Sequence, residues 1–231
     1  MRSRRRGRKS HAASWPRYLC YSITIALFAL IFLIPTLYVF GIISMPATEA
    51  LSSIDLSFIF PALAVSYLFI KGKRPDQIIP ELGLSRKGIN PRNIMYGILL
   101  FMAVLSFGAL VSLVSYATGI PLPTNVQTVL NGLPLYFLIF TFLIAPINEE
   151  ILFRGLMVPR IGIIFSAIIF AVLHASYLSV SEFAAALLFG LIAGYAFKRT
   201  GSLYTSIIGH MLVNLLAIIS FLSIGGMLIH I

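Results

Sequence analysis

Long uninterrupted apolar runs constrain the fold of this chain more than any other feature. A helix needs about 20 mostly apolar residues to cross the roughly 30 Å of hydrocarbon in a bilayer. Seven runs approach or exceed this length, at about residues 19–44, 56–70, 94–117, 135–157, 163–178, 182–197 and 203–224. Of the 231 residues 59% are hydrophobic and only 10% are charged, unlike a soluble domain. The sequence therefore predicts an all-α, polytopic transmembrane helical bundle.

The predicted number of helices is seven or eight. Seven follows from the apolar runs, and an eighth requires one of the long runs to be two pieces. The first and last runs are long enough to tilt or break, and Pro35 and the pair Gly225-Gly226 mark points at which those helices could break. The loop at 71–93 contains three prolines and apolar residues, which favours a short helix lying on the membrane surface.

The distribution of positive charge predicts the orientation. With seven helices and the N-terminus inside, all 17 Lys and Arg fall on the cytoplasmic side. The outer segments at 45–55, 118–134 and 179–181 contain neither residue, which is a strong positive-inside signal. We therefore predict a multi-pass protein of the cell membrane, with a basic cytoplasmic arm at 1–18 and one transmembrane domain at 19–231. The N-terminus is expected in the cytoplasm.

The net charge of +10 raises the question of nucleic acid binding. Positive-inside loops already require such an excess, and the arginine-rich arm would also bind anionic lipid headgroups. We therefore expect membrane lipid, including anionic headgroups, as a partner, and no nucleic acid.

A few polar residues interrupt the apolar runs. They are Glu149, Glu150 and Arg154 in the fourth run, His174 in the fifth, and His210 and Asn214 in the seventh. A charge inside the hydrocarbon costs about 2.5–3.5 kcal/mol on insertion scales, so such residues normally face the bundle interior and pair or react. Six of them in three helices predict one site.

Depth and helical phase refine this site. Counted from the expected inner turns near 160–162 and 198–201, Glu149, His174 and His210 each lie about 15–20 Å into the membrane at 1.5 Å per residue. Glu150 and Arg154 are four residues apart and predict an ion pair on the helix surface, which would anchor its inner end. Glu149 is rotated by about 100° from Glu150 and is expected to face His174 across the hairpin.

A carboxylate, two imidazoles and a carboxamide form a set suited to hydrolysis. A desolvated carboxylate can take a proton from water, and a neighbouring imidazole can share or relay it. A second histidine and an asparagine can donate hydrogen bonds to an oxyanion when a carbonyl is attacked.

These residues resemble the three motifs of the CAAX prenyl protease and bacteriocin-processing (CPBP, Abi) family of membrane proteins, prokaryotic type. The motifs EExxxR, FxxxH and HxxxN are present here as Glu149-Glu150-Ile-Leu-Phe-Arg154, Phe170-Ala-Val-Leu-His174 and His210-Met-Leu-Val-Asn214. Each lies in a predicted membrane helix, and the similarity covers roughly 135–220, which we expect to be the catalytic core. Relatives are commonly counted as eight-helix bundles.

The resemblance implies an intramembrane endopeptidase with a glutamate mechanism, without a bound metal or other cofactor. By position, Glu149 with His174 would activate the water, and His210 with Asn214 would form the oxyanion hole. Glu150, Arg154 and Phe170 would support them. The implied substrate is a peptide or protein, with or without a prenylated C-terminus.

Other functions remain open at this point. Two histidines and a glutamate could ligate zinc, although the sequence has no HExxH motif and Asn214 is a poor zinc ligand. Intramembrane acidic residues also mark proton-coupled transporters, but the chain shows no internal repeat. A bacteriocin self-immunity or scaffold protein without proteolysis would carry the same residues. Asn214 alone could be an interhelical hydrogen-bonding residue.

Overall fold

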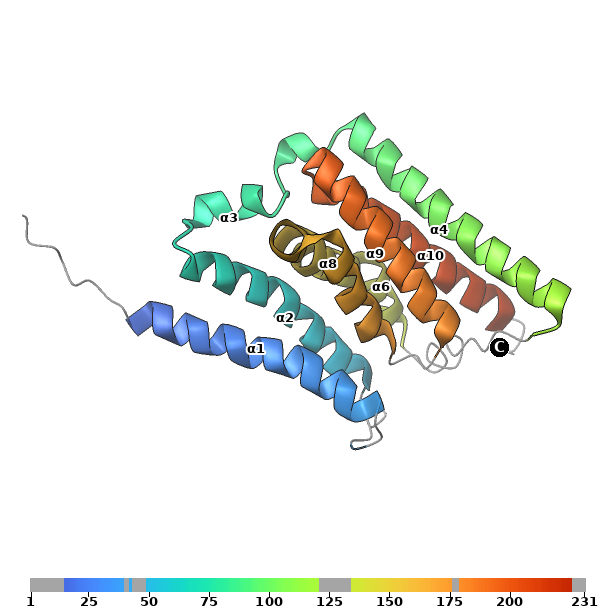
Figure 1. Cartoon of the computed structure of the whole chain (residues 1–231), viewed down its shortest axis with the longest axis horizontal. Helices are drawn as coiled ribbons and strands as arrows, with labels where there is room; N and C mark the ends of the chain where they lie inside the picture. The colour runs from blue at the N-terminus through green and yellow to red at the C-terminus, as the bar shows by residue number, and fades with distance from the viewer. Residues whose placement is uncertain (1–14, 40–41, 43–48, 121–133, 176–178, 226–231) are drawn as a thin grey trace, which may run out of the picture.

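The computed structural model describes residues 15–39, 42, 49–120, 134–175 and 179–225, and all regular structure in these ranges is helical (Figure 1). The all-α prediction is thus confirmed. The elements are α1 (Trp15–Val39), α2 (Glu49–Ile70), α3 (Pro75–Glu81), the 3₁₀ turn η1 (Arg86–Gly88), α4 (Pro91–Thr118), α6 (Leu135–Leu143), α7 (Ala145–Glu150), the π-helix η2 (Ile151–Met157), α8 (Val158–His174), α9 (Val180–Thr200) and α10 (Leu203–Gly225).

Each of the seven predicted apolar runs is mostly helical where the structure describes it, with a bend at residue 42 and a turn at residue 144 as exceptions. Four helical stretches are long and apolar enough to cross a membrane, at Pro91–Thr118, Leu135–His174, Val180–Thr200 and Leu203–Ser223. This is a membrane protein. The short run at 56–70 lies inside the longer α2, and α1 continues through Pro35, a possible break point by sequence. The cytoplasmic N-terminus stays a prediction, and most of the basic arm lies outside the described residues.

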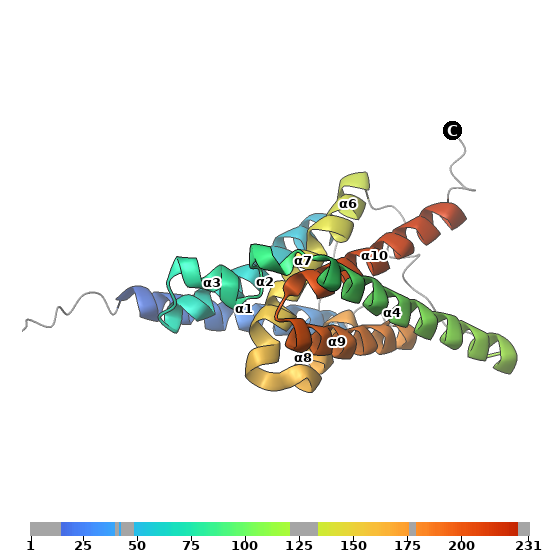
Figure 2. The same ribbon diagram turned by 90° about the horizontal axis from the view of Figure 1, so that it is seen from above.

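The stretch Leu135–His174 is folded into a hairpin. Gly162 has φ 85° and ψ 170°, a backbone conformation that glycine adopts readily and that interrupts the helix. Beyond it the chain returns, and Ser166 Oγ donates to the carbonyl of Phe153 over 2.7 Å. Figure 2 shows this reversal between η2 and α8. The turn that the sequence places near residues 160–162 is therefore present, and it sets the first motif beside the second.

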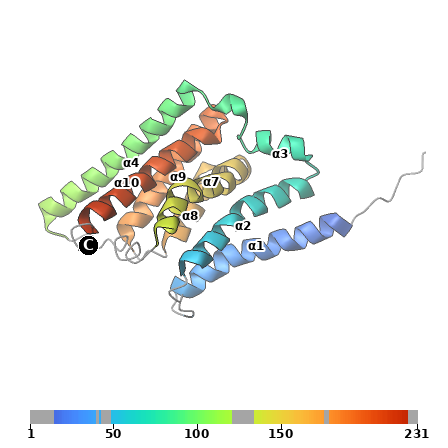
Figure 3. The same cartoon turned by 180° about the vertical axis from the view of Figure 1, so that it is seen from behind.

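Small residues allow close packing of the central helices. A Cβ added to Gly190 of α9 would lie 2.8 Å from the Cβ of Ala167 on α8. A Cβ on Gly97 of α4 would lie 2.9 Å from Ile208 of α10. These approaches explain why α8, α9, α10 and α4 form one layered group, with α2 and then α1 on the other side of the hairpin (Figure 3). The motif-bearing helices are consequently held in the middle of the bundle.

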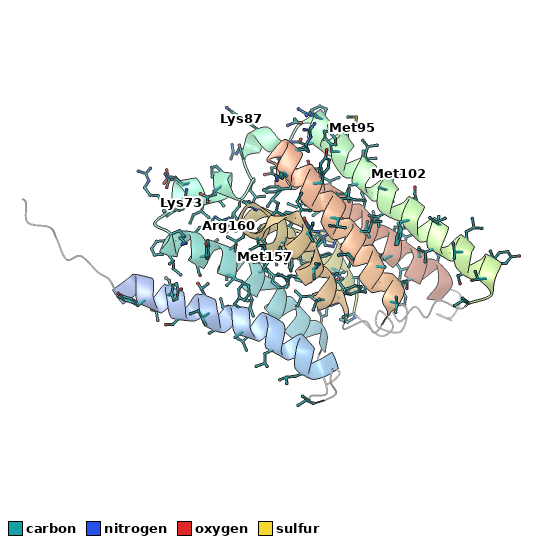
Figure 4. The ribbon with its side chains drawn as sticks, viewed as in Figure 1. Lys73, Lys87, Met95, Met102, Met157 and Arg160 are labelled. Atoms are coloured by element: carbon teal, nitrogen blue, oxygen red, sulfur yellow. The ribbon has the colours of Figure 1, made fainter. Side chains whose placement is uncertain are left out.

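A segment at 71–90 connects α2 to α4 across one end of the bundle, and we call it the inner strap (Figure 1). It contains α3, so the predicted short helix is present. Its backbone is tied to α10, because the Leu203 amide donates to the carbonyl of Gly83 over 3.0 Å. Glu81 of α3 contacts Lys73 at 2.7 Å and Arg160, near the hairpin turn, at 2.9 Å. Figure 4 labels Lys73 and Arg160 in this region. The strap thereby holds the ends of the motif-bearing elements together.

Candidate active site

The first motif begins in α7 and ends in η2, at the centre of the bundle. Asn148, which directly precedes it, is buried and donates its side-chain amide to Ser57 Oγ of α2 over 3.0 Å. All seven residues of η2 are buried, and its π-helical backbone widens the helix locally. Single π turns are frequent at functional sites. The motif is therefore held on both sides by neighbouring helices.

Glu150 and Arg154 form the ion pair that their spacing predicts. Arg154 Nη1 lies 2.9 Å from Glu150 Oε1, and the two side chains are 1% and 0% exposed. The expected position on the helix surface was wrong, because η2 is covered on every side by α2, α8, α9 and α10. A pair in this environment belongs to the core of the protein and does not merely anchor the end of a helix.

Three phenylalanine rings enclose the Arg154 guanidinium. Its Cζ lies 4.4 Å from the centroid of Phe170, 4.9 Å from Phe189 and 6.0 Å from Phe153. Ring faces attract a desolvated cation. Within the described part of the chain, the guanidinium nitrogens have no hydrogen bond of good geometry, so the contact with Glu150 acts as a charge pair. The ring contacts and this single carboxylate hold the guanidinium in place.

His210 of α10 touches both glutamates, each through a different ring nitrogen. Its Nδ1 lies 3.0 Å from Glu150 Oε1, and its Nε2 lies 3.8 Å from Glu149 Oε2. The ring also packs against Phe189, with centroids 4.7 Å apart, and against the edge of Phe170 at 5.9 Å. His210 is therefore the residue that connects the two carboxylates.

His174 lies at the C-terminal end of α8 beside the same aromatic ring. Its Nδ1 donates to the carbonyl of Phe170 over 2.9 Å, and the two rings are 4.4 Å apart. A carbonyl oxygen only accepts, so Nδ1 carries a proton and Nε2 has the lone pair of the neutral ring.

Asn214 lies one turn beyond His210 on α10, and it is half-buried. Its side-chain nitrogen donates to the backbone carbonyl of Thr141 in α6 over 2.9 Å. This is the interhelical hydrogen bond that the sequence left open as an alternative. The structure thus brings Glu149 and Glu150 to His210, whose ring meets Phe170, and it gives Asn214 a contact with a further helix.

Sequence reasoning missed Phe153, Phe189 and Ser57. Phe153 lies inside the first motif, immediately before Arg154, so its position was a usable signal. Phe189 and Ser57 lie outside the three motifs, and nothing distinguishes them among the many Phe and Ser of the chain. Among the described residues, no group of three His, Cys, Asp or Glu side chains is arranged to hold a metal ion.

Comparison with known proteins connects this site to a family. Residues 131–216 match the family model described as type II CAAX prenyl endopeptidase, Rce1-like. This segment is Rce1-like. It contains all three motifs, and it confirms the resemblance to CAAX prenyl proteases. Because the family is one of proteases, the Rce1-like segment supports a peptidase.

One curated relative is similar to part of the chain. It is an uncharacterized 24.3 kDa protein of Escherichia coli, 32% identical over 84 residues, which are 32% of this chain and 39% of that protein. The chain thus matches well under half the length of this relative. No solved structure matches the chain.

Proposed function

We propose that the protein is an intramembrane endopeptidase of the CAAX prenyl protease type II kind, with a metal-independent glutamate mechanism. The observation that carries the proposal is the approach of the partly buried Glu149 to His210, next to Phe170 and His174, inside a segment that matches the Rce1-like family. Ionisable residues within membrane helices mark functional sites. The site has the groups that peptide hydrolysis requires.

Glu149 is the general base in this mechanism. A water oxygen attacks the scissile carbonyl carbon while one of the water protons passes to the Glu149 carboxylate, and the same proton then reaches the leaving amine as the C–N bond breaks. The lone pair on His174 Nε2 would help to orient the water. The hydrogen bond from His174 Nδ1 to the Phe170 carbonyl supports this role, because it fixes the tautomer.

His210 and Asn214 stabilise the oxyanion in this mechanism. Asn214 has two N–H groups, of which one donates to Thr141, so the same amide nitrogen has a second donor for an oxyanion. His210 Nε2, which lies 3.8 Å from Glu149, must carry a proton in order to donate. The ring takes this proton from solvent, so the water proton held by Glu149 remains available for the leaving amine. Removing one donor from such a site typically lowers kcat by a factor on the order of 10²–10³.

The proposed substrate is a peptide or protein at the cell membrane, with or without a prenylated C-terminus. The rival function is that of a self-immunity or scaffold protein, in which the same polar residues serve only folding. A metal-dependent protease is the rival mechanism. All three give different results in one cleavage experiment.

The test uses purified protein in detergent with two fluorogenic peptides of the same CAAX sequence, one farnesylated and one not. Wild type and Glu149→Gln are compared with and without a chelator, and mass spectrometry locates the cleaved bond. Cleavage by wild type that survives chelation and is lost in Glu149→Gln supports the proposal. Loss of cleavage with chelator indicates a metal enzyme. No cleavage of either peptide by folded wild type would overturn the protease assignment for these substrates and favour the immunity or scaffold role.

Anionic lipid headgroups are the proposed partner of the inner strap and the start of α4. Arg86, Lys87 and Arg92 are exposed there, and the neighbouring Ile89 is also exposed, at 61%. Juxtamembrane cations each contribute about 1 kcal/mol of attraction to an anionic surface. In nanodiscs, adding phosphatidylglycerol should therefore raise the unfolding temperature of wild type more than that of Arg86→Gln/Lys87→Gln. An equal rise in both would contradict this partner.

A further inference from the structure

The Glu150 carboxylate reaches beyond its own helix to α10. Its Oε1 atom contacts two groups at once, Arg154 Nη1 at 2.9 Å and His210 Nδ1 at 3.0 Å. None of the Glu150 side chain is exposed, and His210 is 7% exposed. Water cannot readily replace either contact at this depth. The orientation of His210 is therefore coupled to Glu150.

The contact decides which nitrogen of His210 carries a proton. Arg154 is always charged and lies against Glu150, which keeps the carboxylate ionised. An ionised carboxylate only accepts hydrogen bonds, so His210 Nδ1 must donate. The other nitrogen, Nε2, is the one that lies 3.8 Å from Glu149 Oε2. The ring nitrogen that carries no proton, Nε2, thus faces Glu149, the proposed general base.

Packing prevents the ring from reversing this arrangement. Phe189 lies over His210 with centroids 4.7 Å apart, and Phe170 meets it nearly edge-on, at 82°. The same two phenylalanines enclose the Arg154 guanidinium. A flipped imidazole would place a carbon against Glu150 and leave the buried carboxylate without this donor, a loss of about 1.5–3 kcal/mol for a hydrogen bond to a charged group. The flipped ring is therefore disfavoured.

We propose that Glu150 is a positioning residue: it holds His210 with the proton on Nδ1 and with Nε2 directed at Glu149. Arg154 acts one step further away, because it keeps Glu150 ionised. This inference rests on the proposed function for its catalytic consequence, but the tautomer of His210 can be measured without any substrate. The two adjacent glutamates then have separate roles, since Glu149 meets the reacting water and Glu150 orients the histidine.

Two matched double variants separate the hydrogen bond from the ion pair. Glu150→Gln/Arg154→Met removes both charges but keeps an amide oxygen that can accept from Nδ1. Glu150→Met/Arg154→Met also removes both charges and leaves no acceptor. Replacing a buried ion pair by apolar groups of similar volume is often neutral for stability, so both variants are expected to fold. The two variants differ at position 150 alone, where only the Gln side chain has an oxygen that can accept from Nδ1.

The first readout is the ¹⁵N NMR spectrum of histidine-labelled protein, in which Nδ1–H and Nε2–H tautomers have distinct nitrogen shifts. The chain has four histidines, and a His210→Asn spectrum identifies the signals of His210. Wild type and the Gln/Met variant should show Nδ1–H, and the Met/Met variant should shift toward Nε2–H. An Nε2–H tautomer in folded wild type would overturn the proposal without any variant.

The second readout is peptide cleavage. The Met/Met variant should lose about 10- to 100-fold in kcat relative to the Gln/Met variant at similar KM, the range typical when the partner that orients a metal-bound histidine is removed. Equal kcat in the two variants would overturn the positioning role. If wild type shows the Nδ1–H tautomer but cleaves no peptide, the proposed function fails, and with it the catalytic part of the proposal.

Discussion

Two glutamates in this molecule each connect two cationic or imidazole partners, and they do so in opposite environments. Glu81 in the inner strap contacts Lys73 at 2.7 Å and Arg160 at 2.9 Å, and its side chain is 28% exposed. Glu150 contacts Arg154 and His210 at similar distances with no exposure at all. Similar contact geometry therefore occurs once near water and once in the core.

Burial, and not contact distance, therefore decides what such a cluster does. Water screens the pairs of Glu81 and can replace them, so each contributes about 0–1 kcal/mol. No water screens Glu150, so loss of one partner leaves an uncompensated buried charge. The exposed cluster is a replaceable connection between the strap and the hairpin. The buried cluster is obligatory, and it can therefore fix the orientation of a reactive histidine.

The largest expected effect is on Arg154. Arg154→Met leaves the buried Glu150 carboxylate without its paired cation, and it should lower the free energy of unfolding by about 3–5 kcal/mol. Denaturant unfolding in mixed detergent measures this change. A loss below about 1 kcal/mol would remove the contrast between the two clusters.

A neutral buried hydrogen bond should have an intermediate effect. Ser57→Ala removes the acceptor of the buried Asn148 amide and should cost about 1–3 kcal/mol. Ser106→Ala is the matched control, because the hydroxyl of Ser106 is exposed and bonds only within its own helix. If both substitutions cost the same in an unfolding titration, burial does not determine the effect of these hydrogen bonds.

Glu81→Gln should have a small effect. It removes the charge that pairs with Lys73 and Arg160, and the free energy of unfolding at neutral pH should fall by no more than about 1 kcal/mol. The decrease should shrink further in high salt, since exposed pairs are screened. A loss comparable with that of Arg154→Met would show that the strap is as obligatory as the core.

Glu81 also makes the stability of the protein depend on pH. The hydrogen bond from Lys73 holds the pKa of Glu81 below its ordinary value of 4.5, burial opposes this shift, and Arg160 assists it. A lowered pKa in the folded state gives stability that is fully present above pH 4.5 and is lost as the pH falls through the folded pKa. The stability difference between wild type and Glu81→Gln should therefore be constant from pH 7 to about 5 and decline in more acidic buffer. A difference that grows on acidification would refute this sign.

The sequence predicted the helices and the grouping of the motifs because both depend on local patterns. Apolar length identified the membrane runs, and the interruption near Arg160 to Gly162 identified the hairpin turn. The spacing of four residues identified the pair Glu150 and Arg154.

Apart from the expectation that Glu149 faces His174, the sequence did not predict which helix each side chain meets. Helical phase relates Glu149 to Glu150 but does not say that His210 meets both of them. The enclosing ring of Phe189 comes from a helix without a motif, and only tertiary packing brings it over Arg154. Burial of the ion pair also depends on neighbours that are distant in the chain, which explains why a surface position was expected.

Glu149→Gln and Glu81→Gln each replace one carboxylate by an amide, and comparing the two variants tests whether Glu149 is the catalytic base. Cleavage rate and unfolding temperature are recorded for both variants with the same fluorogenic prenylated peptide. We expect Glu149→Gln to remain folded and to lose cleavage, and Glu81→Gln to cleave at close to the wild-type rate with a slightly lower unfolding temperature. Cleavage by Glu149→Gln at the wild-type rate would contradict the account.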